Sequence, residues 1–288
     1  MTTEDMDLRQ ALIRKIEYCV ENDPANRSED GTPYFDAPLV GFASADDDLF
    51  ERYKSIIGPF HWSPSEVLAR AYGPSGPLAQ TVICWVLPIT EETRLSNRKE
   101  NQYPSRKWAR TRHFGELFND VLRKAVVDYI VELGEYAAAP MLMEEWSRVK
   151  DPDIGIASTW SERHAAYAAG LGTFSINDGF ITPKGIAHRV GSVVTNVVME
   201  PSEQPHWDYR ENCLTCRGKT CGVCMSRCPV GAISLKGHDK DLCNKYIYGP
   251  AFKDLSIKFE VEEVGCGLCQ TDVPCESRIP EKTVIGDQ

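Results

Sequence analysis

Apolar residues repeat with a helical period in three stretches of the chain. In residues 7–22 they fall on one face of a helix, and in residues 114–133 they recur every three or four positions until Gly134, a typical residue after a helix end. A shorter helix is predicted over residues 161–169. Each of these stretches carries enough apolar surface on one side to pack against a core.

Two apolar segments rich in β-branched residues, 80–89 and 191–198, predict strands, the first of them buried and central. Helices and strands in alternation predict an α/β layered domain. The polar stretch 94–112 is interpreted as a loop or solvated face. Its alternative role is to bind an anion or a cofactor tail through three arginines, Arg98, Arg110 and Arg112.

Composition narrows the class of protein. Of the 288 residues 42% are hydrophobic, which supports a full core, and the net charge of −10 argues against broad nucleic-acid binding or a polybasic membrane contact. No apolar run is long enough to span a bilayer, and the acidic, polar start differs from a signal peptide. We therefore expect a cytoplasmic protein with no membrane contact.

The cysteines divide the chain. Nine of the 11 lie in residues 206–288, where 11 basic and 12 acidic side chains nearly cancel, so residues 1–205 hold almost all of the net charge. This shift predicts two domains, 1–205 and 206–288. Cys19 and Cys84 lie in apolar stretches and are interpreted as packing thiols.

Cysteine spacing in the second domain predicts metal ligation. The run Cys221-x2-Cys224-x3-Cys228-Pro229 matches the bacterial ferredoxin pattern, in which the last thiolate binds the other cluster. Zinc is the alternative, because C-x2-C pairs also form zinc ribbons. Zinc does not explain the proline and the apolar residues after the run, so we expect two [4Fe–4S] clusters.

The crossed ferredoxin pattern assigns eight ligands. The first cluster takes Cys221, Cys224, Cys275 and one earlier cysteine; the second takes the four thiolates of Cys228, Cys243, Cys266 and Cys269. The earlier cysteine is Cys213 or Cys216, because the insert at 217–220 lets either reach the cluster. We assign Cys213 and leave Cys216 as the spare thiol.

The segment from Glu162 through Gly172 to Gly191, followed by this cysteine run, resembles the epoxyqueuosine reductase and reductive dehalogenase superfamily. The resemblance implies a nitroreductase-like α/β domain that holds a cobalamin, followed by a double-cluster ferredoxin-like domain. It implies corrinoid contacts at four positions, and two nearby hydroxyls add to them. The six predicted corrinoid residues are Gly170, Gly172, Asn177, Gly191, Ser192 and Thr195.

The chain also departs from the family pattern. Epoxyqueuosine reductases carry a catalytic Asp six residues before the position of Glu162, and here that residue is Ile156. The catalytic residues are therefore unknown; Asp153, Tyr167 and His164 are candidate proton donors. The family's helical-repeat tail is not found after Cys275, and with the acidic first domain this makes a tRNA substrate unexpected.

These observations lead to three hypotheses of function. The first is an enzyme that passes single electrons from a donor such as ferredoxin or flavodoxin, through both clusters, to a corrinoid that reduces a small substrate. The second is an electron-transfer partner or reductive activator of a separate corrinoid or redox protein. The third is a ferredoxin whose α/β domain is only a scaffold.

Overall fold

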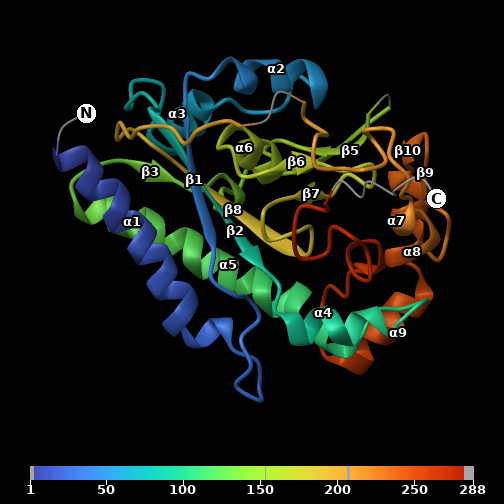
Figure 1. The fold of residues 1–288 in the computed structure, drawn as a ribbon. Helices are drawn as coiled ribbons and strands as arrows, with labels where there is room; N and C mark the ends of the chain where they lie inside the picture. The colour runs from blue at the N-terminus through green and yellow to red at the C-terminus, as the bar shows by residue number, and fades with distance from the viewer. Residues whose placement is uncertain (1–2, 153, 206–207, 282–288) are drawn as a thin grey trace.

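The computed structural model describes residues 3–152, 154–205 and 208–281. Its centre is a four-stranded sheet in the order β1-β2-β8-β3, with every neighbouring pair antiparallel (Figure 1). The sheet packs between helices on both faces, so the mixed helix-and-sheet layering predicted for the first part of the chain is confirmed. The four strands are β1 (Leu39–Ser44), β2 (Thr81–Pro88), β3 (Ala137–Ala138) and β8 (His188–Thr195).

Strand β2 is the buried central strand that its apolar run predicts, and all eight of its residues are buried. Strand β8 begins three residues earlier than predicted and ends at Thr195. The reason is pairing with β2, whose Pro88 lies opposite His188 and whose Thr81 lies opposite Thr195. Pairing with the neighbouring strand thus determines where β8 begins and ends, which the hydropathy pattern alone does not predict.

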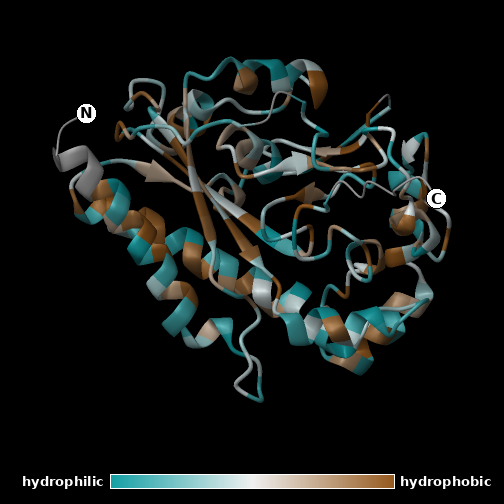
Figure 2. Ribbon diagram, viewed as in Figure 1, coloured by the Kyte–Doolittle hydropathy of each residue, from teal (hydrophilic) through white to brown (hydrophobic). Residues whose placement is uncertain are grey.

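Two helices, α1 (Thr3–Asn22) and α5 (Arg106–Glu132), cover one face of the sheet. Leu12 and Ile16 of α1 and Phe118 and Leu122 of α5 are fully buried in one apolar cluster with β2 residues. In Figure 2 the apolar sides of these helices face the strands and the polar sides face outward. Both predicted amphipathic helices are confirmed, and α5 starts earlier because Ser105 caps it.

The other face of the sheet carries three shorter helices, and Trp160 is buried among them. Ser63 and Glu66 form a reciprocal capping box at the start of α3, which fixes where that helix begins. The predicted helix over 161–169 is confirmed as α6. The helices of this face are α2 (Asp48–Ile56), α3 (Pro64–Tyr72) and α6 (Glu162–Ala168).

The prediction of a loop or solvated face over 94–112 is right only in part. Helix α4 (Glu91–Arg98) occupies the first residues of this stretch and α5 begins at Arg106, so only residues 99–105 form a loop. Thr93 and Asn97 of α4 are buried polar residues, and Asn97 bonds to the Ser105 backbone and to Thr271. The hydropathy pattern does not predict this helix, because the residues on its buried face are polar and form hydrogen bonds with partners distant in the chain.

The cysteine-rich part consists of short elements around loops. Its helices are α7 (Val223–Ser226), α8 (Lys240–Ile247), α9 (Pro250–Phe259) and η3 (Leu268–Gln270), and its hairpin is β9 (Ile233–Ser234) with β10 (Gly237–His238). The remaining short elements of the first part are η1 (Pro24–Asn26), η2 (Pro140–Leu142), β4 (Arg148–Asp151), β5 (Gly155–Ser158), β6 (Thr173–Phe174) and β7 (Phe180–Ile181). In the described part of the chain, no helix combines the length and apolar character needed to cross a membrane.

Candidate functional site

Four cysteines gather beside α7 in a first thiol set. Burial raises the pKa of Cys275, and the neighbouring thiols of Cys224, Cys213 and Cys221 raise it further. Burial also raises the pKa of Cys224 to about 11, again with Cys213 and Cys221 as neighbours. Such mutual effects require short separations between the sulfurs. The structure therefore brings together the four residues assigned to the first cluster.

The second thiol set lies next to the first. Burial raises the pKa of Cys266 to about 11, and Cys243 and Cys228 raise it further. Burial also raises the pKa of Cys269 well above its usual range; Cys266, Cys243 and Cys228 contribute, and so does Cys224 of the first set. The four residues assigned to the second cluster thus also lie together, and the two sets adjoin.

The spare cysteine lies beside the first set. Cys216 forms a hydrogen bond with the thiol of Cys213, and burial together with this contact raises its pKa to about 12. Cys213 is among the main contributors to the raised pKa of Cys224 and of Cys275, and Cys216 is not. This difference favours Cys213 over Cys216 as the ligand, and the assignment stays a prediction.

Both sets fit an iron–sulfur cluster by the chemistry of their donors. Each presents four thiols from segments that lie far apart in the chain, as in two-cluster ferredoxins. Apolar side chains of Ile176, Ile186 and Val273 pack around the first set and lower the local dielectric. Among the described residues, no group of three or more His, Cys, Asp or Glu side chains is arranged to hold a single metal ion.

A buried carboxylate ties the first thiol set to the sheet domain. Glu276 follows Cys275 directly and is only 2% exposed. Its carboxylate accepts two bonds from Arg98 Nε, at 2.9 and 3.0 Å, and lies 3.2 Å from Arg94 Nε, both on α4. It also accepts from the backbone N–H of Asp272 at 2.6 Å. Two arginines therefore fix the loop that carries Cys275.

A second arginine contact organises the other set. Arg227, which precedes Cys228, donates to the carbonyls of Leu268 and Thr271 at 3.3 and 3.1 Å. Its other nitrogens donate to the carbonyls of Glu100 and Asn97 at 2.8 and 3.3 Å. One guanidinium thus links the two cysteine runs to the end of α4.

The three glycines predicted to contact a corrinoid are packed against the protein itself. A Cβ on Gly170 would lie 2.2 Å from the Glu203 carbonyl oxygen, and one on Gly172 would lie 2.3 Å from that of Ile181. A Cβ on Gly191 would meet the ring of Trp85 at 2.3 Å. The missing side chains admit protein atoms, so these positions offer no cradle for a macrocycle.

The three polar residues of the same prediction are also buried and bonded inward. Asn177 donates to the Cys269 carbonyl at 3.0 Å, and its amide oxygen accepts from Gly179 N at 3.0 Å. Ser192 accepts from the indole of Trp160, and Thr195 donates to the Tyr136 carbonyl. Asn177 thus positions a cysteine loop, and a corrinoid contact at these six residues stays an untested prediction that their packing does not support.

Polar side chains that the sequence did not single out lie between α6 and α8. His238 Nδ1 and Lys240 Nζ lie 3.4 and 3.9 Å from the Asp178 carboxylate, and Arg163 donates to the Asp178 carbonyl. His238 also bonds to the Cys243 side chain. The second thiol set therefore borders a charged group of residues, which only the fold brings together.

This charged group also contacts β5, at Ile156. Lys240 Nζ donates to the Ile156 carbonyl at 3.3 Å. Of the candidate proton donors, His164 shares a 2.8 Å bond with Ser161, and Tyr167 is buried in the core of the sheet domain. Asp153 lies outside the described residues. None of these contacts assigns a catalytic residue.

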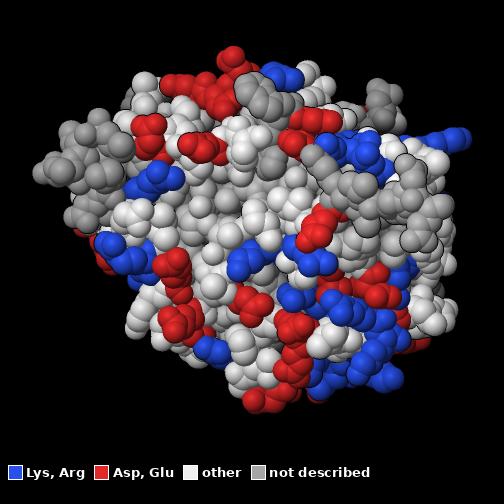
Figure 3. Space-filling view, in the orientation of Figure 1, with Lys and Arg blue, Asp and Glu red and all other residues white. Residues whose placement is uncertain are grey.

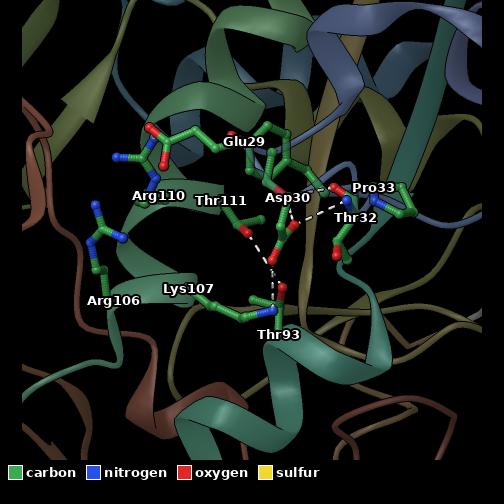
Figure 4. A pocket seen from close by; sticks show the side chains of 11 residues that line it. Glu29, Asp30, Thr32, Pro33, Thr93, Arg106, Lys107, Arg110 and Thr111 are labelled. Atoms are coloured by element: carbon green, nitrogen blue, oxygen red, sulfur yellow. Dashed lines mark hydrogen bonds and ion pairs between the residues drawn. The ribbon is translucent and has the colours of Figure 1, made fainter.

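The three arginines named for anion binding all form ion pairs. Arg98 pairs with Glu276, Arg112 with Glu263 at 2.6 Å, and Arg110 with Glu29 at 2.6 Å. Arg110 borders a hollow of about 350 Å³ at the start of α5. Figure 4 shows basic and acidic side chains facing one another there, with Lys107 paired to Asp30. These arginines are committed to protein carboxylates.

Charge is unevenly spread over the surface. In Figure 3 acidic side chains gather over α2, at the top of the view, and Lys and Arg side chains gather at the lower right, over α4 and α9. The overall charge of −10 therefore does not predict the sign of a local surface.

Comparison with known proteins gives a match only at the level of structure, since no family model and no curated protein matches the chain. An epoxyqueuosine reductase from Bacillus subtilis aligns over 96% of this chain and 68% of its own, with 19% identity and a TM-score of 0.50. An epoxyqueuosine reductase with a tRNA-Tyr stem loop aligns over 94% and 66%, with 19% identity and a TM-score of 0.51.

A reductive dehalogenase in complex with 3-bromo-4-hydroxybenzoic acid aligns over 94% of this chain but only 36% of its own, with 15% identity and a TM-score of 0.53. The predicted resemblance is thus confirmed for the fold, across both the sheet domain and the cysteine-rich part. The chain has the fold that epoxyqueuosine reductases and reductive dehalogenases share.

Proposed function

We propose that this chain is an iron–sulfur reductase in which two [4Fe–4S] clusters pass single electrons to an acceptor. The observation that carries the proposal is the convergence of eight cysteines into two adjoining sets of four. We interpret residues 206–288 as a ferredoxin-like domain and residues 1–205 as a nitroreductase-like domain. The fold shared with two groups of reductases supports this interpretation.

The clusters would supply one-electron chemistry, and the chain sets where it occurs. Cys213, Cys221, Cys224 and Cys275 would hold the first cluster, and Cys228, Cys243, Cys266 and Cys269 the second. The N–H of Ala232 donates to Cys228 Sγ at 3.3 Å, a contact that favours the more negative, reduced form of a cluster. Because the sets adjoin, an electron can pass between them without a mobile carrier.

The acceptor would bind near the charged residues beside the second set. Asp178, His238 and Lys240 lie next to Cys243, so a polar acceptor there would be within reach of the second cluster. Burial raises the pKa of Asp178, but His238 and Lys240 stabilise its carboxylate more strongly, so that its pKa is lowered. Its negative charge would orient the acceptor rather than donate a proton.

A resident corrinoid does not fit the residues predicted to hold it. Glu203, Ile181 and Trp85 occupy the space beside the three glycines. We therefore derive no step through cobalamin. The same observation favours a second candidate function, an electron-transfer partner or reductive activator that serves a separate corrinoid or redox protein.

The proposal is tested by iron and sulfide analysis after anaerobic reconstitution. We expect about eight iron atoms and eight sulfides per chain, the content of two [4Fe–4S] clusters. Cys224→Ser should lose about half of the iron, and Cys19→Ser, whose residue lies on α1, should keep all of it. Stoichiometric zinc with little iron would reject the proposal.

Titration with cob(II)alamin separates the two candidate functions. An electron paramagnetic resonance change at stoichiometric cobalamin would support an enzyme with its own corrinoid and would overturn our account of the filled glycine positions. An unchanged spectrum at large excess would favour the electron-transfer partner. A small-molecule acceptor can then be identified by adding candidate compounds to the reduced protein and following oxidation of its clusters. We do not propose tRNA as the substrate.

A further inference from the structure

The insert in the first cysteine run forms a rigid turn. Arg217 N donates to the Cys213 carbonyl at 3.1 Å, and Lys219 N donates to that of Leu214 at 2.9 Å. Gly218 adopts a φ of +69°, which reverses the chain as at a helix C-terminus. The insert is therefore a turn closed by backbone hydrogen bonds, with its side chains exposed.

This turn presents two cations to solvent. Arg217 and Lys219 are exposed, and neither forms an ion pair with any residue that the structure describes. The guanidinium of Arg217 makes one long bond, 3.4 Å, to the Glu211 carbonyl. Most charged residues in the site are committed to partners, so these two cations differ from Arg98, Arg110 and Arg112.

The neighbouring residues extend the same surface. Arg210 lies over the ring of Tyr209 at 5.2 Å, and Tyr209 is 53% exposed. Arg210 also affects the pKa of Cys216 and so lies near the first thiol set. Two carboxylates, Asp208 and Glu211, belong to this segment, so its three cations leave a net charge of +1. We define the basic loop face as Tyr209, Arg210, Arg217, Lys219 and Cys221.

The basic loop face contains the most accessible thiol of the eight. Cys221 is exposed, whereas the other seven assigned ligands are buried or half-buried. Electron transfer weakens steeply with distance, so a partner that docks over Cys221 has the shortest path to a cluster. The second set instead borders Asp178 and His238, inside the fold.

We propose that the basic loop face binds a negatively charged one-electron carrier protein, which reduces the first cluster. This inference rests on the proposed function. The carrier loses one electron, the first cluster changes from the 2+ to the 1+ state, and no bond forms or breaks. Opposite charges increase the association rate and favour one orientation, and the exposed Tyr209 supplies an aromatic contact.

The test is stopped-flow reduction of the reconstituted protein by a reduced acidic bacterial ferredoxin at several salt concentrations. Arg217→Glu with Lys219→Glu should lower the second-order rate constant at low salt by about tenfold or more and flatten its salt dependence. Arg217→Gln with Lys219→Gln should give a smaller change in the same direction. Lys253→Glu with Lys258→Glu on α9 carries the same change of charge and should stay within about twofold of the original rate.

Iron content and the extent of reduction by excess dithionite distinguish failure of this inference from failure of the proposed function. Variants with full iron that ferredoxin reduces at the original rate, with an unchanged salt dependence, would overturn the docking surface alone. An equal loss of rate in the α9 control would also overturn the docking surface, because the net charge of the protein would then explain the change in rate without a specific binding face. Little iron in the unaltered protein would overturn the proposed function and this inference with it.

Discussion

At the scale of single residues, the two cysteines that begin the first run have different surroundings. Cys213 is among the main contributors to the pKa of Cys224 and Cys275, whereas the main thiol neighbour of Cys216 is Cys213. Only Leu214 and Thr215 separate the two cysteines in the chain, yet the thiols have different neighbours. This difference favours Cys213 as the ligand, an assignment that stays a prediction.

We predict that Cys216→Ser keeps about eight iron atoms per chain and that Cys213→Ser loses about half. The serine at 216 can still bond to the Cys213 sulfur, but a serine at 213 removes a thiolate from the set. Iron analysis of both variants checks this. The reverse pattern would make Cys216 the ligand and would show that the insert shifts when iron binds.

A buried histidine makes stability depend on pH. His61 is 2% exposed, and burial lowers its pKa to about 4, below the usual 6.5 of the unfolded chain. Its ring stacks near Trp160, and its Nε2 accepts from the Ser161 N–H at 3.1 Å, a bond that needs the neutral ring. Between pH 6.5 and 4 the unfolded state therefore binds more protons than the folded state.

We predict that the free energy of unfolding falls as pH drops from 6.5 towards 4, with His61 alone contributing on the order of 3 kcal/mol at pH 4. Urea unfolding followed by tryptophan fluorescence measures this. His61→Asn keeps an acceptor but does not titrate, so its stability should fall less steeply over the same range. Parallel pH curves for the two proteins would exclude His61 as a source of the effect.

At the scale of elements, the hairpin of β6 and β7 is a support for the thiol sets. Asn177 in its loop bonds to the Cys269 carbonyl, and Ile186 N, just beyond it, donates to the Cys275 carbonyl at 2.8 Å. Gly172 precedes the hairpin and packs against the Ile181 carbonyl. A change in the hairpin should therefore reach both cysteine loops.

We predict that Gly172→Val destabilises the protein by roughly 2–4 kcal/mol and lowers its iron content, because the new side chain collides with backbone. Thermal unfolding and iron analysis check both effects. Gly134→Val serves as a control: a Cβ there meets open space, although its positive φ adds some strain. Full iron in Gly172→Val, with only cobalamin binding lost, would instead support the corrinoid prediction for that glycine.

At the scale of the whole molecule, the two parts differ in what holds them together. The sheet domain has large apolar clusters on both faces of its sheet, whereas the apolar clusters of the cysteine-rich part are smaller and α8, which carries Cys243, has no buried residue. Bound clusters would therefore serve as much of the core of the cysteine-rich part.

We predict that removing iron with a chelator increases amide hydrogen exchange in residues 213–247 by at least tenfold and leaves β2 and the centre of α5 unchanged. Exchange followed by mass spectrometry, with and without iron, measures this. An equal increase in β2 would mean that the molecule unfolds as one unit. Unchanged exchange in 213–247 would mean that its side-chain packing suffices without metal.

The sequence by itself predicted the features that depend on local spacing. These features are the apolar period of α1 and α5, the buried run of β2 and the cysteine spacing. Each depends only on residues close together in the chain, because helical pitch and ligand loops are local geometry. It also indicated the shared fold through a motif confined to about 30 residues before the cysteine run. It misjudged part of residues 94–112, where α4 forms around buried polar groups.

Only the tertiary structure decided what distant residues do to one another. Glu276 meets Arg98 across 178 positions of sequence, and Asp178 meets His238 from another part of the chain. The glycines near Gly172 have the composition of a ligand cradle, yet the carbonyl of Ile181 fills the space. A missing side chain signals close approach but not which group approaches, because that depends on packing between segments whose separation no local pattern records.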